Sequence, residues 1–286
     1  MIDADIVAYR IASKNEQRYN WGADEETGEE ITTVIVNDPK DVEAQVHETI
    51  QEYLAATQAD DFLICLSDDN YNWRKKVLPS YKQNRKESIR PELLYPLKEF
   101  MYDQFPSARK DTLEADDVMG IYSTHPKLIA GRKIIVSEDK DMKTIPGWLW
   151  NPSKDLKPRL VSLEEADLFH MQQTLTGDTT DGYKGCPGAG KGEFDKIAAS
   201  PFKLVPYEHT FKRGVRAGET EIRFRKEPCE TIWEAIVSQY EAKGLTEYHA
   251  ITQARVARIL RHTDFDYKKK EVILWQPPVT TVSTSI

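Results

Sequence analysis

Short apolar runs alternate along the chain with segments that have the spacing of helices. Runs rich in β-branched residues recur near residues 5–9, 62–66 and 133–136, and each is too short to be a helix alone. Residues 31–36 follow a turn at 24–28 and predict a further strand. Strands that alternate with helices are typical of an α/β fold, so we expect a largely parallel central sheet.

Two helix starts can be read directly from capping residues. Asp38 and Pro39 combine an N-cap with proline at the first helical position, ahead of an apolar stripe. The stripe consists of Val42, Val46, Ile50 and Leu54. Ser162 and Glu165 form the spacing of a capping box and predict a helix that runs to about residue 175.

The C-terminal part of the chain has a different pattern. We expect a helix from about Glu193, and two more near residues 230–243 and 246–261. Residues 267–275 predict a final strand, and the Pro-, Thr- and Ser-rich tail is expected to be poorly ordered. We therefore predict an α/β domain over residues 1–160, a helical subdomain over 161–276 and a tail over 277–286.

Composition narrows the class of protein. The 286 residues are 40% hydrophobic, which is enough for a folded core, and the formal charge is −8. Three scattered cysteines provide neither a disulfide framework nor a zinc site. No apolar run is long enough for a membrane span, and the first residues lack the layout of a signal peptide, so we expect an intracellular protein without a membrane partner.

Acidic residues gather where predicted strands end or helices begin. The groups contain Asp3, Asp5, Asp68, Asp69, Glu114, Asp116, Asp117, Asp139, Asp141, Asp178 and Asp181. Strand ends line the ligand crevice of open α/β sheets, and carboxylates placed close together repel one another. Ligands that are all oxygen favour Mg²⁺ or Mn²⁺ over Zn²⁺, so the pattern predicts a divalent metal centre.

Two of these acidic groups need a geometric comment. Asp5 is an alternative to Asp3, because alternation along a strand would put both on one face. Residues two apart on a helix point to nearly opposite sides, so we expect Glu114 to precede a helix whose first turn holds Asp116 and Asp117.

A basic segment and a glycine-rich segment are candidates for phosphate contact. Residues 74–90 hold seven bases and one acid, including Lys82 and Arg85 beside the aromatic Tyr81. Residues 177–192 place closely spaced glycines before a predicted helix, although they do not match a Walker A loop. The candidate phosphate contacts are Arg74, Lys75, Lys76, Lys86, Lys184, Gly185, Gly188, Gly190 and Lys191.

Taken in order, these motifs resemble the flap endonuclease / 5′→3′ exonuclease superfamily, especially the exonucleases of short-tailed bacteriophages. The motifs are Ile-Asp-Ala-Asp, Tyr-Lys-Gln-Asn-Arg, Glu-Ala-Asp-Asp, Glu-Asp-Lys-Asp-Met and Gly-Asp-Thr-Thr-Asp-Gly-Tyr-Lys-Gly-Cys-Pro-Gly. The resemblance implies a PIN-like (Rossmann-like) α/β fold with a helical arch at about residues 74–95. It also implies a helix–three-turn–helix element for duplex DNA at about residues 177–198.

The resemblance also implies the site. One metal group would contain Asp3, Asp68, Glu114 and Asp116, and the other Asp139, Asp141, Asp178 and Asp181. Asp117 would lie close by, Lys82 and Arg85 would contact the scissile phosphate, and Tyr81 would stack. A monovalent cation could occupy the turn from Gly185 to Gly190. Glu138 and the pair Gly182-Tyr183 depart from the family pattern without removing a ligand.

The implied function is 5′→3′ exonuclease cleavage of duplex DNA, and of RNA in RNA–DNA hybrids, by two Mg²⁺ or Mn²⁺ ions. It would serve phage DNA replication, primer removal, recombination and host DNA degradation in the cytoplasm of the bacterial host, with replication proteins as candidate partners. The same residues would support a structure-specific 5′ flap endonuclease. An alternative of another class is a non-catalytic DNA-binding module, which the complete set of acidic positions disfavours.

Overall fold

The computed structural model describes residues 1–286 except 25–26, 29, 86–88 and 279–286. It divides into two compact units, each built from several stretches of chain. We call them the sheet unit, which comprises residues 1–73, 87–163 and 259–272, and the helical unit, which comprises residues 74–86, 164–258 and 273–286. The predicted arch segment 74–95 is thus divided between the units, and part of the C-terminal region belongs to the sheet unit.

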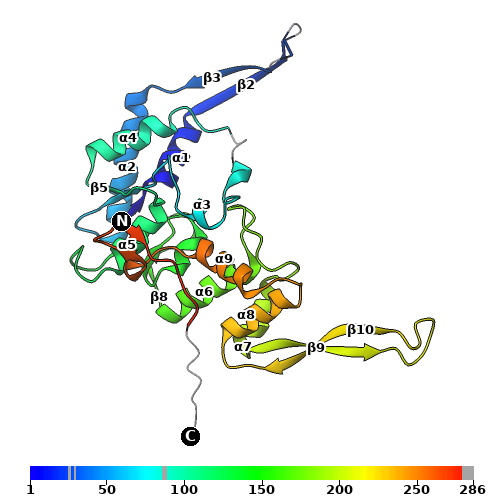
Figure 1. The fold of residues 1–286 in the computed structure, drawn as a ribbon. Helices are drawn as coiled ribbons and strands as arrows, with labels where there is room; N and C mark the ends of the chain where they lie inside the picture. The colour runs from blue at the N-terminus through cyan, green and yellow to red at the C-terminus, as the bar shows by residue number, and fades with distance from the viewer. Residues whose placement is uncertain (25–26, 29, 86–88, 279–286) are drawn as a thin grey trace. The chain divides into compact units, whose positions relative to one another are not determined.

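A six-stranded sheet forms the centre of the sheet unit, in the order β5-β4-β1-β6-β7-β8. Figure 1 labels its two outer strands, β5 and β8. All neighbouring strands are parallel except the last pair, β7 and β8. The strands are β1 (Ile2–Asp3), β4 (Ile64–Leu66), β5 (Ser107–Arg109), β6 (Ile134–Val136), β7 (Gly147–Trp150) and β8 (Arg159–Val161). The predicted fold class, α/β with a mostly parallel sheet, is confirmed.

Helices pack around this sheet and bury its apolar strands. They are α1 (Ala4–Lys14), α2 (Pro39–Thr57), α4 (Leu94–Gln104) and α5 (Ala115–Thr124), with 3-10 turns η2 (Lys140–Thr144) and η3 (His262–Asp264). The predicted helix after Asp38 is confirmed, and Asp38 caps it by accepting from the Lys40 N–H. The prediction of a strand at residues 5–9 was wrong. These residues lie in α1, whose buried positions have helical spacing.

Two small antiparallel pairs complete the sheet unit. The strand expected at residues 31–36 is β3 (Glu30–Val36), and its partner β2 (Glu16–Ala23) was not expected. Residues 267–275 do not form the single strand that we predicted. Instead, β11 (Phe265–Asp266) pairs with the equally short β12 (Glu271–Val272).

The helical unit contains two segments of the predicted arch and most of the C-terminal half of the chain. Its elements are α3 (Arg74–Val77), η1 (Gln83–Arg85), α6 (Leu163–Thr176), α7 (Lys191–Ala199), β9 (Phe202–Thr210), β10 (Thr220–Pro228), α8 (Ile232–Glu241) and α9 (Glu247–Ala257). Leu175, Phe194, Ile236 and Ala250 share one core, which joins α6, α7, α8 and α9.

The helices predicted from residues 162, 193, 230 and 246 are all present, although α9 ends at Ala257 rather than near residue 261. The long β9–β10 hairpin was not predicted. The tail prediction for residues 277–286 falls mostly outside the described residues. Among the helices that the structure describes, none is both long and apolar enough to cross a membrane.

Candidate functional site

Three acidic residues follow three neighbouring strands of the sheet unit. Asp3 ends β1, Asp68 follows β4 and Asp139 follows β6, and β1 lies between the other two strands. Because these strands are parallel, their carboxyl ends meet at one edge of the sheet. The sequence pattern therefore correctly predicted that these acidic residues lie at the carboxyl ends of the strands.

Asp3 is buried at this edge, with 2% of its surface exposed. Its carboxylate accepts a hydrogen bond from the Ser137 hydroxyl (2.7 Å) and one from the Ile6 N–H (3.2 Å). Burial raises the pKa of Asp3 to about 7, and the charges of Asp5 and Asp139 add to the increase. The donors around Asp3 are neutral, so they orient its carboxyl without adding positive charge.

Asp68 is more open than Asp3 and is oriented by backbone groups. It accepts from the N–H groups of Thr112 (2.8 Å) and Asn70 (2.9 Å). Burial acts to raise the pKa of Asp68, but these backbone hydrogen bonds outweigh it and hold the pKa below its usual range. Asp68 also lines a cavity of about 510 Å³, together with Arg109 and Lys110. A charged carboxylate therefore faces an open, polar space.

The next acidic group lies at the start of α5. Glu114 is the N-cap and stands outside the helix, as predicted, while Asp116 and Asp117 occupy the first turn. Asp117 is fully buried and accepts from the Trp73 indole N–H (2.9 Å) and the Leu260 N–H (3.1 Å). It also accepts from the Glu114 N–H in a capping box, so it fixes the position of Glu114.

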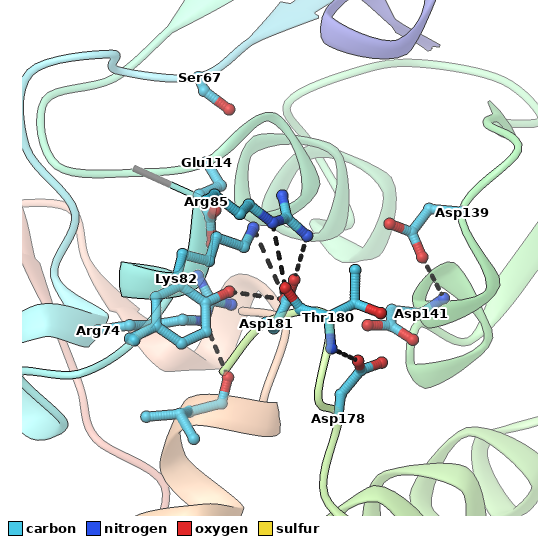
Figure 2. Close-up of polar contacts among 12 residues, drawn as sticks. Ser67, Arg74, Lys82, Arg85, Glu114, Asp139, Asp141, Asp178, Thr180 and Asp181 are labelled. Atoms are coloured by element: carbon cyan, nitrogen blue, oxygen red, sulfur yellow. Dashed lines mark hydrogen bonds and ion pairs between the residues drawn. The ribbon is translucent and has the colours of Figure 1, made fainter. Parts of the chain in front are cut away.

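Asp139 and Asp141 lie on one short turn after β6. Asp139 caps η2, and its carboxylate accepts from the Asp141 N–H at 2.8 Å (Figure 2). The Ser137 hydroxyl oxygen accepts from the Asp139 N–H at 3.1 Å while its own proton goes to Asp3. Ser137 therefore joins the first and fourth acidic motifs, a role that we did not predict, although its position directly after a strand was a signal.

Asp5 differs from Asp3 in both position and charge partners. It lies in α1 rather than in a strand, so the expected sharing of one strand face was wrong. Lys98 is 3% exposed and forms ion pairs with Asp5 (3.0 Å) and Asp69 (2.6 Å). Burial acts to lower the pKa of Lys98, but the two carboxylates raise it above its usual value. A lysine within the apolar stripe of α4 was the sequence signal for this cluster.

The donor set of the edge fits a hard divalent ion, because its side-chain oxygens come from carboxylates and hydroxyls. The raised pKa of Asp3 shows that a cation there would relieve burial and repulsion. Among the described residues, no three His, Cys, Asp or Glu side chains already form a metal-ligand group.

In the helical unit, Asp181 is surrounded by the residues expected to contact phosphate. Its carboxylate accepts from the Tyr81 hydroxyl (2.9 Å) and forms ion pairs with Arg85 (2.5 Å) and Lys82 (3.6 Å). Figure 2 shows Lys82 and Arg85 both reaching this carboxylate. The structure thus brings the predicted arch bases together with one of the predicted metal ligands.

Hydrogen bonds to backbone carbonyls also join residues 82–84 to residues 179–181. The Lys82 N–H donates to the Asp181 carbonyl (2.8 Å), and the Asn84 amide donates to the carbonyls of Thr179 (3.0 Å) and Thr180 (3.2 Å). Lys82 itself has a left-handed backbone with φ of 54°. Asn84 was missed from the sequence because it carries no charge, yet it lies inside the Tyr-Lys-Gln-Asn-Arg motif.

Two residues predicted to touch DNA are buried instead. Arg74 is 2% exposed and donates to the carbonyls of Val256 (2.9 Å) and Arg258 (2.8 Å), so it joins α3 to the end of α9. Tyr81 is also 2% exposed, and the cations of Arg74 and Lys82 lie over its ring. In this structure Arg74 is a packing residue, and the Tyr81 ring is not open to a base.

Asp178 lies at the start of the glycine-rich segment. Its carboxylate accepts from the Thr180 N–H (2.8 Å), and its backbone pairs with that of Tyr183. Gly177 and Gly185 both have positive φ, and a Cβ on Gly185 would come within 2.3 Å of the Gly177 nitrogen. Glycine is needed at both positions, because the two backbones touch.

The segment ends at the N-terminus of α7, where Gly190 is the N-cap and makes no side-chain cap hydrogen bond. A Cβ on Gly190 would meet nothing within 4 Å, and one on Gly188 only the Lys243 ammonium at 3.9 Å. Lys75, Lys76 and Lys184 are exposed, and Lys191 pairs with Asp195 at 2.9 Å. Lys86 lies outside the described residues.

The order of the motifs is matched by a known family. A family model described as the N-terminal resolvase-like domain of 5′-3′ exonucleases matches residues 2–147. The chain belongs to the 5′-3′ exonuclease family. This 5′-3′ exonuclease is 38% identical to the exodeoxyribonuclease of Enterobacteria phage T3 over 218 residues, which are 73% of this chain and 71% of that relative. It is 37% identical to the exonuclease of Escherichia phage T7, over 73% and 72% of the two chains.

Solved structures of bacteriophage T5 nucleases share the fold of this exonuclease. The T5 5′-exonuclease with bound zinc ions has a TM-score of 0.56 and 15% identity, over 90% of this chain and 92% of the T5 chain. A T5 flap endonuclease complex with DNA and metal ions has a TM-score of 0.51 and 18% identity, over 70% and 74%. These matches agree with the predicted fold class and with the resemblance drawn from the motifs.

Proposed function

We propose that this nuclease removes nucleotides stepwise from the 5′ ends of duplex DNA and depends on Mg²⁺ or Mn²⁺. Membership of the 5′-3′ exonuclease family supports the reaction, and the T3 and T7 relatives support a phage exonuclease rather than a binding module. The observation that carries the metal proposal is the raised pKa of Asp3, whose buried carboxyl lies at a strand edge beside Asp139.

The acidic residues of the sheet unit would hold the metal ions. We assign Asp3, Asp68, Glu114 and Asp116 to one ion, and Asp139 and Asp141 to a second ion that Asp178 and Asp181 help to bind. Asp5 is not assigned, since Lys98 already balances its charge. When bound, a pair of divalent ions activates a water and stabilises the leaving oxygen of the phosphodiester.

The remaining residues would position these ligands and the substrate. Ser137 orients Asp3 through its hydroxyl proton, and Asp117 fixes the backbone of Glu114. Lys82 and Arg85 would exchange the carboxylate of Asp181 for the scissile phosphate and neutralise its charge. The exchange would release Asp181 for metal binding at the time when the phosphate arrives.

Duplex DNA would be held by the glycine-rich turn and the N-terminus of α7. N–H groups at a helix start bind phosphate, and the glycines leave open space around Gly190. Lys75, Lys76 and Lys184 are exposed and would add positive charge. A monovalent cation at this turn, RNA–DNA hybrid substrates, replication partners and action in the bacterial cytoplasm remain predictions drawn from the resemblance.

The test is a time course on a 5′-labelled duplex and a matched 5′-flap duplex, each with Mg²⁺ or EDTA, with products resolved by length. We expect labelled mononucleotides from the duplex in Mg²⁺ and no product in EDTA. A 3′-labelled duplex should shorten gradually in the same reaction. Products of flap length alone would favour the flap endonuclease, a reading that the T5 neighbour keeps open. Binding without any cleavage would contradict the proposal.

A further inference from the structure

We propose that the β9–β10 hairpin is an arm that binds the phosphate backbone of duplex DNA away from the cleaved end. The inference rests on the proposed function, because it assumes that duplex DNA is the substrate. It adds a second contact surface to the glycine-rich turn, on a part of the chain to which the sequence patterns gave no role.

The hairpin is long and is fixed only at its base. Its ladder pairs residues 202–210 with residues 220–228, and at about 3.4 Å per residue each nine-residue strand spans about 30 Å. Phe202 packs against the core of the helical unit, and the Leu204 N–H donates to the Ser238 hydroxyl of α8 (3.0 Å). Figure 1 shows the two strands extending away from α7 and α8.

Positive charge collects on this hairpin, although the whole protein is acidic. Residues 202–228 contain seven Lys or Arg against four Glu, a formal charge of +3 in a chain of −8. The bases near the strands are paired with glutamates: Arg216 with Glu219 and Glu221, Arg223 with Glu221, Arg225 with Glu227, and Lys226 with Glu193. The net positive charge of the hairpin therefore comes from the bases that have no such pair.

Two of those bases lie in the turn. Lys212 and Arg213 are exposed, and neither forms an ion pair within the described part of the chain. Val215, which follows them, is also fully exposed. The turn thus presents two uncompensated cations at the free end of the arm, where they can reach an anion without first breaking a contact.

An aromatic and basic face continues from the turn along the hairpin. The Arg216 guanidinium carbon lies 3.9 Å from the centre of the Phe211 ring, and that of Arg223 lies 5.2 Å from it. His209 packs edge-on against the same ring at 5.1 Å. The ring and the glutamates hold these arginines in place, and a phosphate would have to compete with Glu219 and Glu221 for their N–H groups.

A comparison with the β2–β3 hairpin shows why we choose a polyanion as the partner. Residues 16–36 contain one base against six acids, a formal charge of −5. The exposed side chains of β2 and β3 include Trp21 and Ile35, at 69% and 53% exposure, and would not attract DNA. Of these two hairpins, β9–β10 is the one with charge complementary to phosphate, and it belongs to the same unit as the glycine-rich turn.

The experiment compares DNA affinity in EDTA for the wild-type protein, the double variant Lys212→Ala/Arg213→Ala, and the control Lys268→Ala/Lys269→Ala. The control removes the same charge from another exposed turn. Fluorescence anisotropy would give the Kd for duplexes of about 10 and about 30 base pairs over a range of salt concentrations, because the arm spans roughly nine base pairs at 3.4 Å each.

Loss of two phosphate contacts should reduce the slope of log affinity against log salt by about 2 on the long duplex. We expect a much smaller change on the short duplex, and no change in the control. An unaltered slope on the long duplex, as expected if the arm binds a protein instead, would overturn the proposal. An equal reduction in the control would also overturn it, because net charge alone would then explain the effect.

Cleavage separates this inference from the proposed function. The double variant should release mononucleotides from the short duplex in Mg²⁺ at a rate within about twofold of wild type, since the arm lies away from the reacting phosphate. If the wild-type protein cleaves nothing, the proposed function fails, whereas the binding result still decides whether the arm contacts DNA. Lys212→Gln/Arg213→Gln, compared by circular dichroism, provides a second variant should the first unfold.

Discussion

Asp3 and Asp68 of the sheet unit and Asp181 of the helical unit are held in opposite ways. In the sheet unit, Asp3 and Asp68 accept hydrogen bonds from backbone N–H groups and the Ser137 hydroxyl, all of which are neutral. In the helical unit, Asp181 accepts from Tyr81 and is paired with Lys82 and Arg85. The first two carboxylates are oriented by neutral groups, whereas the third is already compensated by cations.

This difference indicates that acidic residues predicted together as metal ligands can have different roles. A carboxylate held by neutral donors can attract a metal ion, because a cation would offset the burial and the repulsion that raise the pKa of Asp3. A carboxylate paired with lysine and arginine instead keeps those bases in place. The Asp181 carboxylate holds Lys82 and Arg85, so a phosphate would have to compete with it for these two bases.

The largest effect is expected from removing one charge at the sheet edge. Asp139→Asn should lower the cleavage rate about 1,000-fold or more, as is typical when an enzyme loses one group that stabilises charge in the transition state. Single-turnover cleavage of a 5′-labelled duplex would measure it. Asp103→Asn, an exposed position in α4, is the matched control and should cleave normally. Normal activity of Asp139→Asn would mean that the edge is not the metal centre.

A smaller loss of activity is expected when one of the bases paired with Asp181 is substituted. Arg85→Ala should lower kcat/KM about 100-fold, since its guanidinium would neutralise charge on the phosphate in the transition state. Lys75→Ala removes an exposed base of α3 and should change kcat/KM by no more than a few-fold. Equal losses in both variants would show that the basic segment acts through its total charge, and not through the bases placed beside Asp181.

A third variant tests Arg74, which was predicted to contact DNA but is buried in the structure. Arg74→Met should lower the free energy of unfolding by about 2–3 kcal/mol, because two carbonyls lose a charged donor inside the helical unit. Urea denaturation would measure it, with Lys75→Ala expected within about 0.5 kcal/mol of wild type. The folded fraction of Arg74→Met should still bind duplex DNA. A specific loss of affinity without loss of stability would restore the original DNA-contact prediction.

The smallest effect concerns the ion pairs of Asp181 themselves. Asp181→Asn should weaken the hold on residues 81–85 by about 0.5–1 kcal/mol, the worth of partly exposed ion pairs. Amide hydrogen exchange in that segment should then speed up roughly two- to fivefold. Asp178→Asn alters a carboxylate of the same turn that accepts from Thr180, and should leave residues 81–85 unchanged. Equal acceleration in both variants would mean that the whole turn had loosened.

Much of the sheet and its acidic edge could be predicted because local rules apply there. Strands β4 and β6 are short apolar runs, each followed by a serine and then by acidic residues, and parallel pairing puts those residues at one edge. The assignment failed for α1, where a run with β-branched residues also has helical spacing. It also failed for the β9–β10 hairpin, whose strands carry charged residues that break the apolar signal.

The fate of individual bases could not be predicted for a different reason. Arg74 and Lys82 lie in one basic segment, yet Arg74 is buried against carbonyls that follow it by more than 180 residues. Nothing within the segment distinguishes the two residues, because the distinction depends on contacts far apart along the chain. The same holds for Lys98, whose charge is balanced by Asp5 and Asp69 across the fold.

Direct measurement of metal binding tests the central claim, that the carboxylates at the sheet edge form the divalent metal centre. Isothermal titration of Mn²⁺ into wild type, Asp139→Asn and Asp103→Asn would give the number of bound ions and their Kd. We predict that Asp139→Asn loses at least one ion or binds it at least tenfold more weakly, with Asp103→Asn equal to wild type. The same stoichiometry and affinity in all three proteins would contradict the account.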